Sequence, residues 1–298
     1  MKLFVHGFGY TAGVLADRLL ALGWQVAGTS RRPEGRDRLA ARGILPVDPA
    51  DPEGLEAGLA GSDALLLSAA PGPEGCPGHA ALAPLLDRGA ARPDWVGYLS
   101  TTGVYGDHGG RWVFERTAVT PLSPEAVRRV AAEQAWLALG DRLGLSATIF
   151  RLPGIYGPDL DGKGRSPFAR LRAGTARRYD KPGQVFSRIH VSDLAEGLVA
   201  SLRRPRPGGI YNLCDDEPAP AAEVTAHAAA LLGLPLPPLE PFDEATLSPM
   251  ARRFYGESKR VSNARAKAEL GWRPAYPTYR EGLAAILAAE KSVSPPTR

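Results

Sequence analysis

The amino-acid sequence predicts an α/β fold, in which a doubly wound parallel sheet is followed by a smaller C-terminal lobe. Over the first two thirds of the 298 residues, short apolar segments alternate with segments of helical periodicity. The apolar segments are apolar nearly throughout, which is typical of parallel strands covered on both faces. A glycine-rich turn also joins the first apolar segment to the first helical one.

The first half of the chain supplies most of these elements. A strand at 3–5 precedes a helix at 11–22, where Leu15, Leu19 and Leu22 fall on one face. Further strands are expected at 24–30, 44–47, 64–69, 95–100 and 146–152. Further helices are expected at 34–42, near 51, at 79–88 and at 123–139. The last of these begins with Ser123 as a candidate N-cap and Pro124 at the first position.

After residue 153 the pattern changes. The segment 154–183 is rich in loops and basic residues. One more helix is expected at 191–202, and one more strand, which completes the sheet, at 209–213. Beyond residue 215, Pro-rich turns separate two expected helices, at 221–232 and 263–270.

Composition excludes several classes of protein. Hydrophobic residues make up 44% and charged residues 23%, as in an ordinary globular protein rather than a disordered chain or coiled coil. The net charge of +4 is scattered, so we expect no nucleic-acid partner. No apolar run reaches 18 residues and the N-terminus lacks a signal-peptide pattern, so we expect no membrane association. Two cysteines predict neither a disulfide framework nor a metal site, and favour a cytoplasmic location.

The glycine-rich turn is the first candidate site. Residues 7–12 read G-x-G-x-x-A, with Gly7, Gly9 and Ala12 at the small positions and Tyr10 and Thr11 between them. Gly7 permits the tight turn, Gly9 permits close approach of a pyrophosphate, and Ala12 permits close helix–strand packing. The N–H groups of the following helix then face the anion. We expect these residues to bind a dinucleotide; the alternative is a purely structural turn.

The end of the second strand favours NADP over NAD. NAD sites usually carry an acid about 20 residues after the glycines. Between residues 13 and 33 the only acid is Asp17, within the first helix, whereas the strand ends in Ser30, Arg31 and Arg32. A hydroxyl with guanidinium groups suits a 2′-phosphate. The alternative is that these arginines are solvated turn residues.

Several motifs in order resemble the extended short-chain dehydrogenases/reductases, the NAD-dependent epimerase/dehydratase group. They are the glycine turn, YLSTTGVYG at 98–106, RLPGIYGP at 151–158, IHVSDLA at 189–195, YNL at 211–213 and ELGWRP at 269–274. The resemblance implies a Rossmann-type NADP-binding domain at 1–160, completed by about 190–214. It also implies a substrate lobe from 161–189 and 215–298. The cofactor contacts it implies, besides the turn, are Asp48 at the adenine; Ala69, Ala70 and Pro71 along the dinucleotide; and Ser100, Thr101 and Pro153 near the nicotinamide.

Two departures from the family pattern point to its atypical subgroup. The phosphate loop is one residue shorter than usual, and the family's Tyr-x-x-x-Lys pair is replaced by Glu125 and Arg129. Only the hydroxyl member of the catalytic set remains, as Thr101. Arg129 offers charge but exchanges no proton near neutrality. Glu125 can transfer a proton if burial raises its pKa, or it can simply serve the helix start.

Other candidates are Tyr105, as a proton donor or as a packed wall residue, and a basic set that can line an anionic substrate pocket. That set is Arg177, Arg178, Arg188, Arg252, Arg253, Lys259 and Arg260; the alternative is a solvated basic face. We therefore expect an NADP(H)-dependent oxidoreductase or epimerase-like enzyme, monomeric or homodimeric. Its substrate would be a small carbonyl, alcohol or sugar-type molecule, anionic if the basic set forms a pocket. The competing hypothesis is a catalytically inactive NADP(H) sensor.

Overall fold

The computed structural model describes residues 1–159 and 166–293, and the chain divides into two compact units. Unit 1 comprises Met1–Val104, Pro121–Arg151 and Ala195–Tyr211. Unit 2 comprises Tyr105–Thr120, Leu152–Leu194 and Asn212–Arg298.

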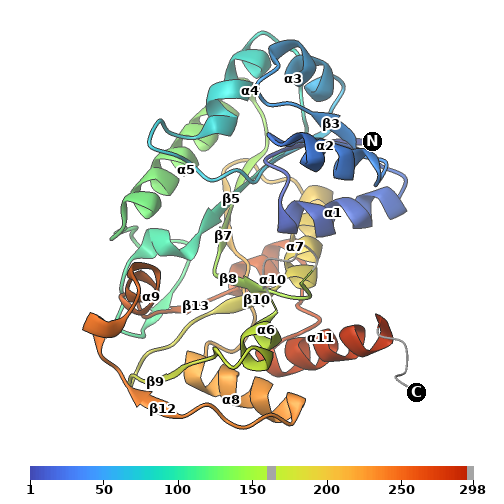
Figure 1. Cartoon of the computed structure of the whole chain (residues 1–298). Coiled ribbons are helices and arrows are strands. Elements are labelled where there is room, and N and C mark those ends of the chain that lie inside the picture. The colour runs from blue at the N-terminus through green and yellow to red at the C-terminus, as the bar shows by residue number, and fades with distance from the viewer. Residues whose placement is uncertain (160–165, 294–298) are drawn as a thin grey trace. The chain divides into compact units, whose positions relative to one another are not determined.

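Unit 1 is built on a seven-stranded sheet in the order β11-β7-β5-β4-β1-β2-β3 (Figure 1). Its strands are β1 (Lys2–His6), β2 (Gln25–Thr29), β3 (Leu45–Val47), β4 (Ala64–Leu67), β5 (Trp95–Thr101), β7 (Ala147–Leu152) and β11 (Gly209–Asn212). The pairs β1–β2, β2–β3, β1–β4 and β4–β5 are all parallel. The predicted α/β fold with a doubly wound parallel sheet is confirmed.

Helices alternate with these strands, as the periodicity predicts. They are α1 (Tyr10–Ala21), α2 (Pro33–Ala40), α3 (Pro52–Leu59), α4 (Pro77–Asp87), α5 (Pro124–Leu143) and α7 (Val191–Arg203). The Ser123 hydroxyl caps α5 by accepting from the N–H of Ala126 at 3.1 Å. The helix ends at Gly144, whose φ of 67° is the left-handed conformation of a C-terminal glycine. Phe4, Trp136 and other apolar side chains form the core beneath them.

The strand order places a topological switch point between β1 and β4. The chain runs outward from β1 to β3, then returns to form β4 on the other side of β1. The loops that leave the carboxyl ends of β1 and β4 therefore diverge, and in open α/β sheets such a divergence is where ligands bind. The glycine turn follows β1, and residues 69–71 follow β4.

Unit 2 contains three two-stranded parallel pairs and shorter helices. The pairs are β6 (Trp112–Val113) with β13 (Arg260–Val261), β8 (Gly154–Tyr156) with β10 (Arg188–His190), and β9 (Arg178–Asp180) with β12 (Leu239–Pro241). The helices are α6 (Pro167–Arg172), α8 (Ala221–Leu232), α9 (Pro249–Tyr255), α10 (Ala264–Leu270) and α11 (Tyr279–Val293). The sequence analysis expected α8 and α10 but left out α6, α9 and α11.

The part of the chain that the structure describes contains neither a membrane-spanning helix nor a cluster of metal-ligating side chains. Within 1–159 and 166–293, no helix is long and apolar enough to cross a membrane. Nor does any group of three or more His, Cys, Asp or Glu side chains in that part of the chain form a possible metal site.

Candidate functional site

The glycine turn after β1 is hydrogen-bonded to the end of β2, and it is open to solvent at Gly9. Gly7 has a φ of 89°, and its N–H donates to the Thr29 hydroxyl at 2.8 Å. The N–H of Phe8 donates to the Thr29 carbonyl at 3.1 Å. A Cβ on Gly9 would meet no atom within 4 Å, so the space over the start of α1 is free in the described structure. This is the arrangement that lets a pyrophosphate approach helix N–H groups.

The turn lies directly against the loop that follows β4. A Cβ on Gly7 would lie 2.5 Å from the Ala69 nitrogen, so only glycine fits there. The side chains of Tyr10, Thr11 and Ala12 are buried. A phosphate at this turn would therefore meet their backbone N–H groups rather than their side chains. The structure thus brings together the two loops that the sequence analysis assigned to the dinucleotide.

At the end of β2 the side chains of Arg31 and Arg32 are exposed, and among the described residues neither forms an ion pair. Arg36 was not predicted as a site residue. Its guanidinium donates to the Ser30 carbonyl at 3.0 Å and pairs with Asp48 at 2.9 Å. The predicted contact of Asp48 with adenine stays a prediction, and its carboxylate is already engaged by this arginine.

The carboxyl end of β5 is anchored by a buried ion pair that sequence reasoning missed. The Ser100 hydroxyl donates to Glu133 Oε1 at 2.5 Å, and Glu133 pairs with Arg151 at 2.8 Å. The side chains of the pair are 4% and 6% exposed. The available signal was an arginine inside the apolar strand 146–152, since a buried charge requires a partner. The Ser100 hydroxyl thus points into the interior.

Thr101, the last residue of β5, keeps a hydroxyl proton to donate. Its Oγ1 accepts from the N–H of Gly103 at 3.1 Å, which fixes the side chain without using its O–H. The side chain is partly exposed. Such an oriented hydroxyl is suited to hold a substrate oxygen.

The two residues at the Tyr and Lys positions of the family lie in different environments. Arg129 is half-buried and donates to the Leu99 carbonyl at 2.5 Å and to the Tyr98 hydroxyl at 3.3 Å. Burial raises the pKa of Tyr98 to about 12, so this phenol is no base near neutrality. Glu125 lies in the first turn of α5 with a side chain that is 56% exposed, 3.9 Å from Arg128.

Tyr105 and Pro153 belong to unit 2. Tyr105 is fully buried, and its hydroxyl donates to Asn212 Oδ1 at 2.8 Å. This geometry matches the packed-wall interpretation, in which a buried phenol keeps a hydrogen-bond partner. Its role as a proton donor and the contact of Pro153 with nicotinamide stay predictions.

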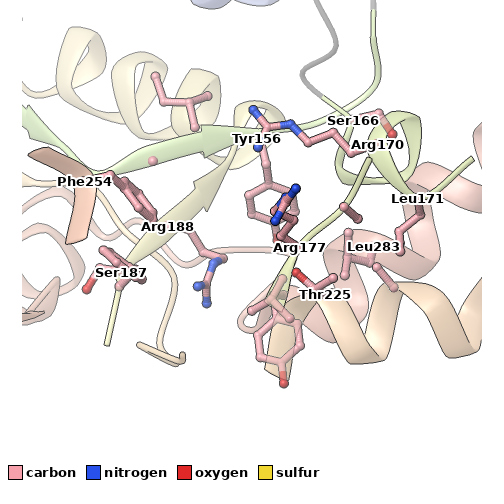
Figure 2. Close-up of a pocket in the computed structure, with 17 residues that line it drawn as sticks. Tyr156, Ser166, Arg170, Leu171, Arg177, Ser187, Arg188, Thr225, Phe254 and Leu283 are labelled. Atoms are coloured by element: carbon pink, nitrogen blue, oxygen red, sulfur yellow. The ribbon is translucent and has the colours of Figure 1, made fainter. Parts of the chain in front are cut away.

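Unit 2 contains a cavity of about 510 Å³ (Figure 2). Of the predicted basic set, Arg177 and Arg188 line it. Arg178, Lys259 and Arg260 are instead hydrogen-bonded to backbone carbonyls elsewhere in the unit; the side chain of Arg253 lies outside the described residues. Lining residues that were not predicted include Tyr156, Arg170, Phe186, Val224, Phe254, Tyr279 and Leu283.

Comparison with known proteins decides the family. The model of the NAD dependent epimerase/dehydratase family matches residues 4–214. The chain belongs to this family. Protein YeeZ of Escherichia coli is 31% identical over 291 residues, which cover 93% of this chain and 96% of that protein. A 3-diazoavenalumate denitrifying reductase from Streptomyces sp is 34% identical over 164 residues, 53% of this chain and 51% of that protein.

Solved structures resemble this epimerase/dehydratase family member over nearly its whole length. A functionally unknown conserved protein from Silicibacter pomeroyi DSS is 51% identical, with a TM-score of 0.88 over 97% of this chain and 98% of that one. UDP-glucose 4-epimerase from Thermotoga maritima, solved with UDP-glucose, is 18% identical, with a TM-score of 0.81 over 99% and 100%. The latter shows the shared fold.

Proposed function

We propose that the protein is an NADP(H)-dependent oxidoreductase or epimerase-like enzyme that exchanges hydride with a small carbonyl, alcohol or sugar-type substrate. The observation that carries this proposal is the close packing of Gly7 on Ala69 at the switch point, with open space over Gly9 and the start of α1. Membership of the NAD dependent epimerase/dehydratase family supports it. The turn, Ala69, Ala70 and Pro71 would hold the dinucleotide.

Preference for NADP rests on the end of β2. Arg31 and Arg32 are exposed and carry no acidic partner among the described residues. The Ser30 hydroxyl lies beside them and donates to the Arg32 carbonyl at 3.3 Å. Guanidinium groups bind phosphate by charge-assisted hydrogen bonds. An acid at this position would instead suit the free 2′-hydroxyl of NAD. Arg36 is already paired with Asp48, so it orders the loop rather than adding a free charge.

Thr101 is the residue we assign to the substrate. When bound, the nicotinamide supplies or accepts the hydride. The Thr101 hydroxyl, oriented by the N–H of Gly103, would donate to the substrate oxygen. Arg129, held on the Leu99 carbonyl, contributes positive charge near this strand end but no proton. The proton then comes from Glu125, Tyr105, water or the substrate itself.

The second candidate is a dinucleotide-binding sensor without turnover. It is favoured by the 56% exposure of Glu125, which argues for a helix-start role, and by the engagement of Arg129 with β5. It needs the same cofactor site as the enzyme. The partner for either candidate is a small molecule rather than a nucleic acid, and we further propose a cytoplasmic monomer or homodimer.

Calorimetry with NADPH and NADH, followed by a panel of aldehydes, ketones and nucleotide sugars, separates these candidates. The enzyme is expected to bind NADPH more tightly and to oxidise it with at least one panel member, seen as loss of NADPH fluorescence. Thr101→Val should abolish turnover while Thr246→Val, at an exposed hydroxyl of unit 2, should not. Tight binding without turnover would favour the sensor. Absence of heat with both coenzymes would refute both.

A further inference from the structure

The cavity of unit 2 combines apolar walls with guanidinium groups. Its apolar lining includes Phe186, Phe254, Val224 and Leu283, and the two phenylalanine rings stack with centroids 3.9 Å apart. The cations that line it are Arg170, Arg177 and Arg188, and no aspartate or glutamate is among its lining residues within the described chain. Figure 2 shows these three arginines entering the same pocket from α6, from the start of β9 and from β10. The pocket therefore suits a molecule that combines an apolar body with negative charge.

Arg188 provides the point of charge. One nitrogen, Nη2, donates to the Ala219 carbonyl at 3.0 Å, and the guanidinium lies 5.4 Å from the ring of Tyr279. The other nitrogen, Nη1, is buried and has no hydrogen-bond partner. An unsatisfied buried donor on a cation is costly, and the cost is relieved when an anion reaches it.

Among the described residues, no carboxylate accepts a hydrogen bond from the buried Nη1 of this guanidinium. Asp215 interacts electrostatically with Arg188, and its backbone N–H donates to the Arg188 carbonyl at 2.8 Å. Its carboxyl oxygens are buried. Burial raises the pKa of Asp215 to about 8, and the charge of Arg188 lowers it by less. Burial thus favours the neutral form of this carboxyl, and Arg188 keeps a buried nitrogen without a hydrogen-bond partner.

The other two arginines have weaker but distinct roles. Arg170 is exposed and forms no ion pair among the described residues. Arg177 pairs with Glu240 at 3.0 Å, and its side chain is 65% exposed. These groups attract an anion through solvent, where salt screens them. Arg172, two residues after Arg170 on α6, does not line the cavity and pairs with Glu290 at 2.5 Å. It is a matched control.

We propose that this cavity binds a small organic monoanion, a carboxylate on an aromatic or aliphatic body, with the carboxylate on Arg188 and the body between the phenylalanine and aliphatic walls. A single buried, unsatisfied guanidinium suits one carboxylate, because the planar fork matches its two oxygens. A nucleoside diphosphate carries more negative charge than this one guanidinium matches, and the other two lining arginines, Arg170 and Arg177, are exposed. That this anion is the substrate rests on the proposed function, whereas the binding site does not.

The test is calorimetry on the full-length protein, with and without NADPH, using three probes. We expect 3-phenylpropanoate to bind, and the neutral 3-phenylpropanol to bind at least about tenfold more weakly, because it lacks the charge-assisted hydrogen bonds. UDP, which carries a diphosphate and a base, should bind no more tightly than 3-phenylpropanoate. Arg188→Gln should weaken carboxylate binding about tenfold or more. Arg170→Gln should weaken it a few-fold at low salt, and Arg172→Gln should leave it unchanged.

Equal affinity for the acid and the alcohol would overturn the proposal, as would displacement of 3-phenylpropanoate by UDP at much lower concentration. Equal losses of 3-phenylpropanoate affinity in Arg170→Gln and Arg172→Gln would overturn the role of Arg170. Should Arg188→Gln fail to fold, the acid–alcohol comparison in the unaltered protein still decides. Binding of 3-phenylpropanoate in a protein that binds neither coenzyme would leave this inference standing while the proposed function falls.

Discussion

The buried pair beneath β5 allows a stability effect to be worked from the structure. In Glu133→Gln the side chain keeps its size but loses its charge. Arg151, only 6% exposed, would then lose three guanidinium–carboxylate contacts of 2.8 to 3.2 Å, and Ser100 would lose its 2.5 Å bond to a carboxylate. Removing one partner of a buried ion pair typically costs about 3–5 kcal/mol, because the remaining charge cannot return to water. We expect a loss of that size in the free energy of unfolding of unit 1.

Urea unfolding followed by tryptophan fluorescence measures this loss, since Trp95 and Trp136 are buried in unit 1. Hydrogen exchange of peptides from β5 and β7 assigns the loss to unit 1 rather than unit 2. The matched control is Asp87→Asn, which breaks another ion pair made by α5, between Asp87 and Arg142. Those side chains are 42% and 57% exposed, so little change is expected. A Glu133→Gln protein no less stable than the Asp87→Asn protein would refute the reasoning.

Three further predictions follow from the same structure. Gly7→Ala should abolish NADPH binding and lower the melting temperature, because the added Cβ would lie 2.5 Å from the Ala69 backbone nitrogen at a φ of 89°. Gly9→Ala should lose NADPH binding but keep its melting temperature, because the added Cβ would enter open space. Gly282→Ala should destabilise unit 2 by about 1–3 kcal/mol through overpacking, since its Cβ falls on the Tyr156 hydroxyl, and calorimetric melting should show partial rescue by Tyr156→Phe. Burial lowers the pKa of His6 from 6.5 to about 4, so its contribution to stability is present above pH 6.5 and is lost as pH falls toward 4, by up to ~3 kcal/mol. The melting temperature of His6→Gln should change less with pH across that range than that of the unaltered protein. The same pH dependence of the melting temperature in both proteins would contradict this.

The fold of unit 1 was predictable because its strands carry a strong signal. A strand covered on both faces is apolar along nearly its whole length. The strand 64–67 is apolar throughout, and 147–152 is apolar except at Thr148 and Arg151, so both are readily recognised. The glycine turn was predictable for a similar reason. Gly7 is confined by backbone on one side and must adopt a positive φ, and no residue with a Cβ meets both requirements.

Unit 2 was harder to predict, because several of its strands have three residues or fewer and so show no periodicity. The cavity is assembled from segments between residues 154 and 283, a juxtaposition that only tertiary structure creates. Among the basic residues, sequence could not tell Arg188, which keeps a free buried nitrogen, from Arg178, whose guanidinium is engaged by backbone carbonyls. The helix α11 did carry a signal, in the spacing of Leu283 and Ile286.

The position of Arg129 constrains the chemistry of any turnover. A lysine at this place can lower the pKa of a nearby tyrosine and exchange protons, whereas a guanidinium stays charged near neutrality. Here the guanidinium is bound to the Leu99 carbonyl, and the phenol it touches, Tyr98, has a raised pKa. Neither group then moves a proton at neutral pH. The proton would then come from the substrate itself or from a water held by Thr101. In the proposed reaction, the residues present therefore favour substrates whose hydride transfer needs no strong general acid.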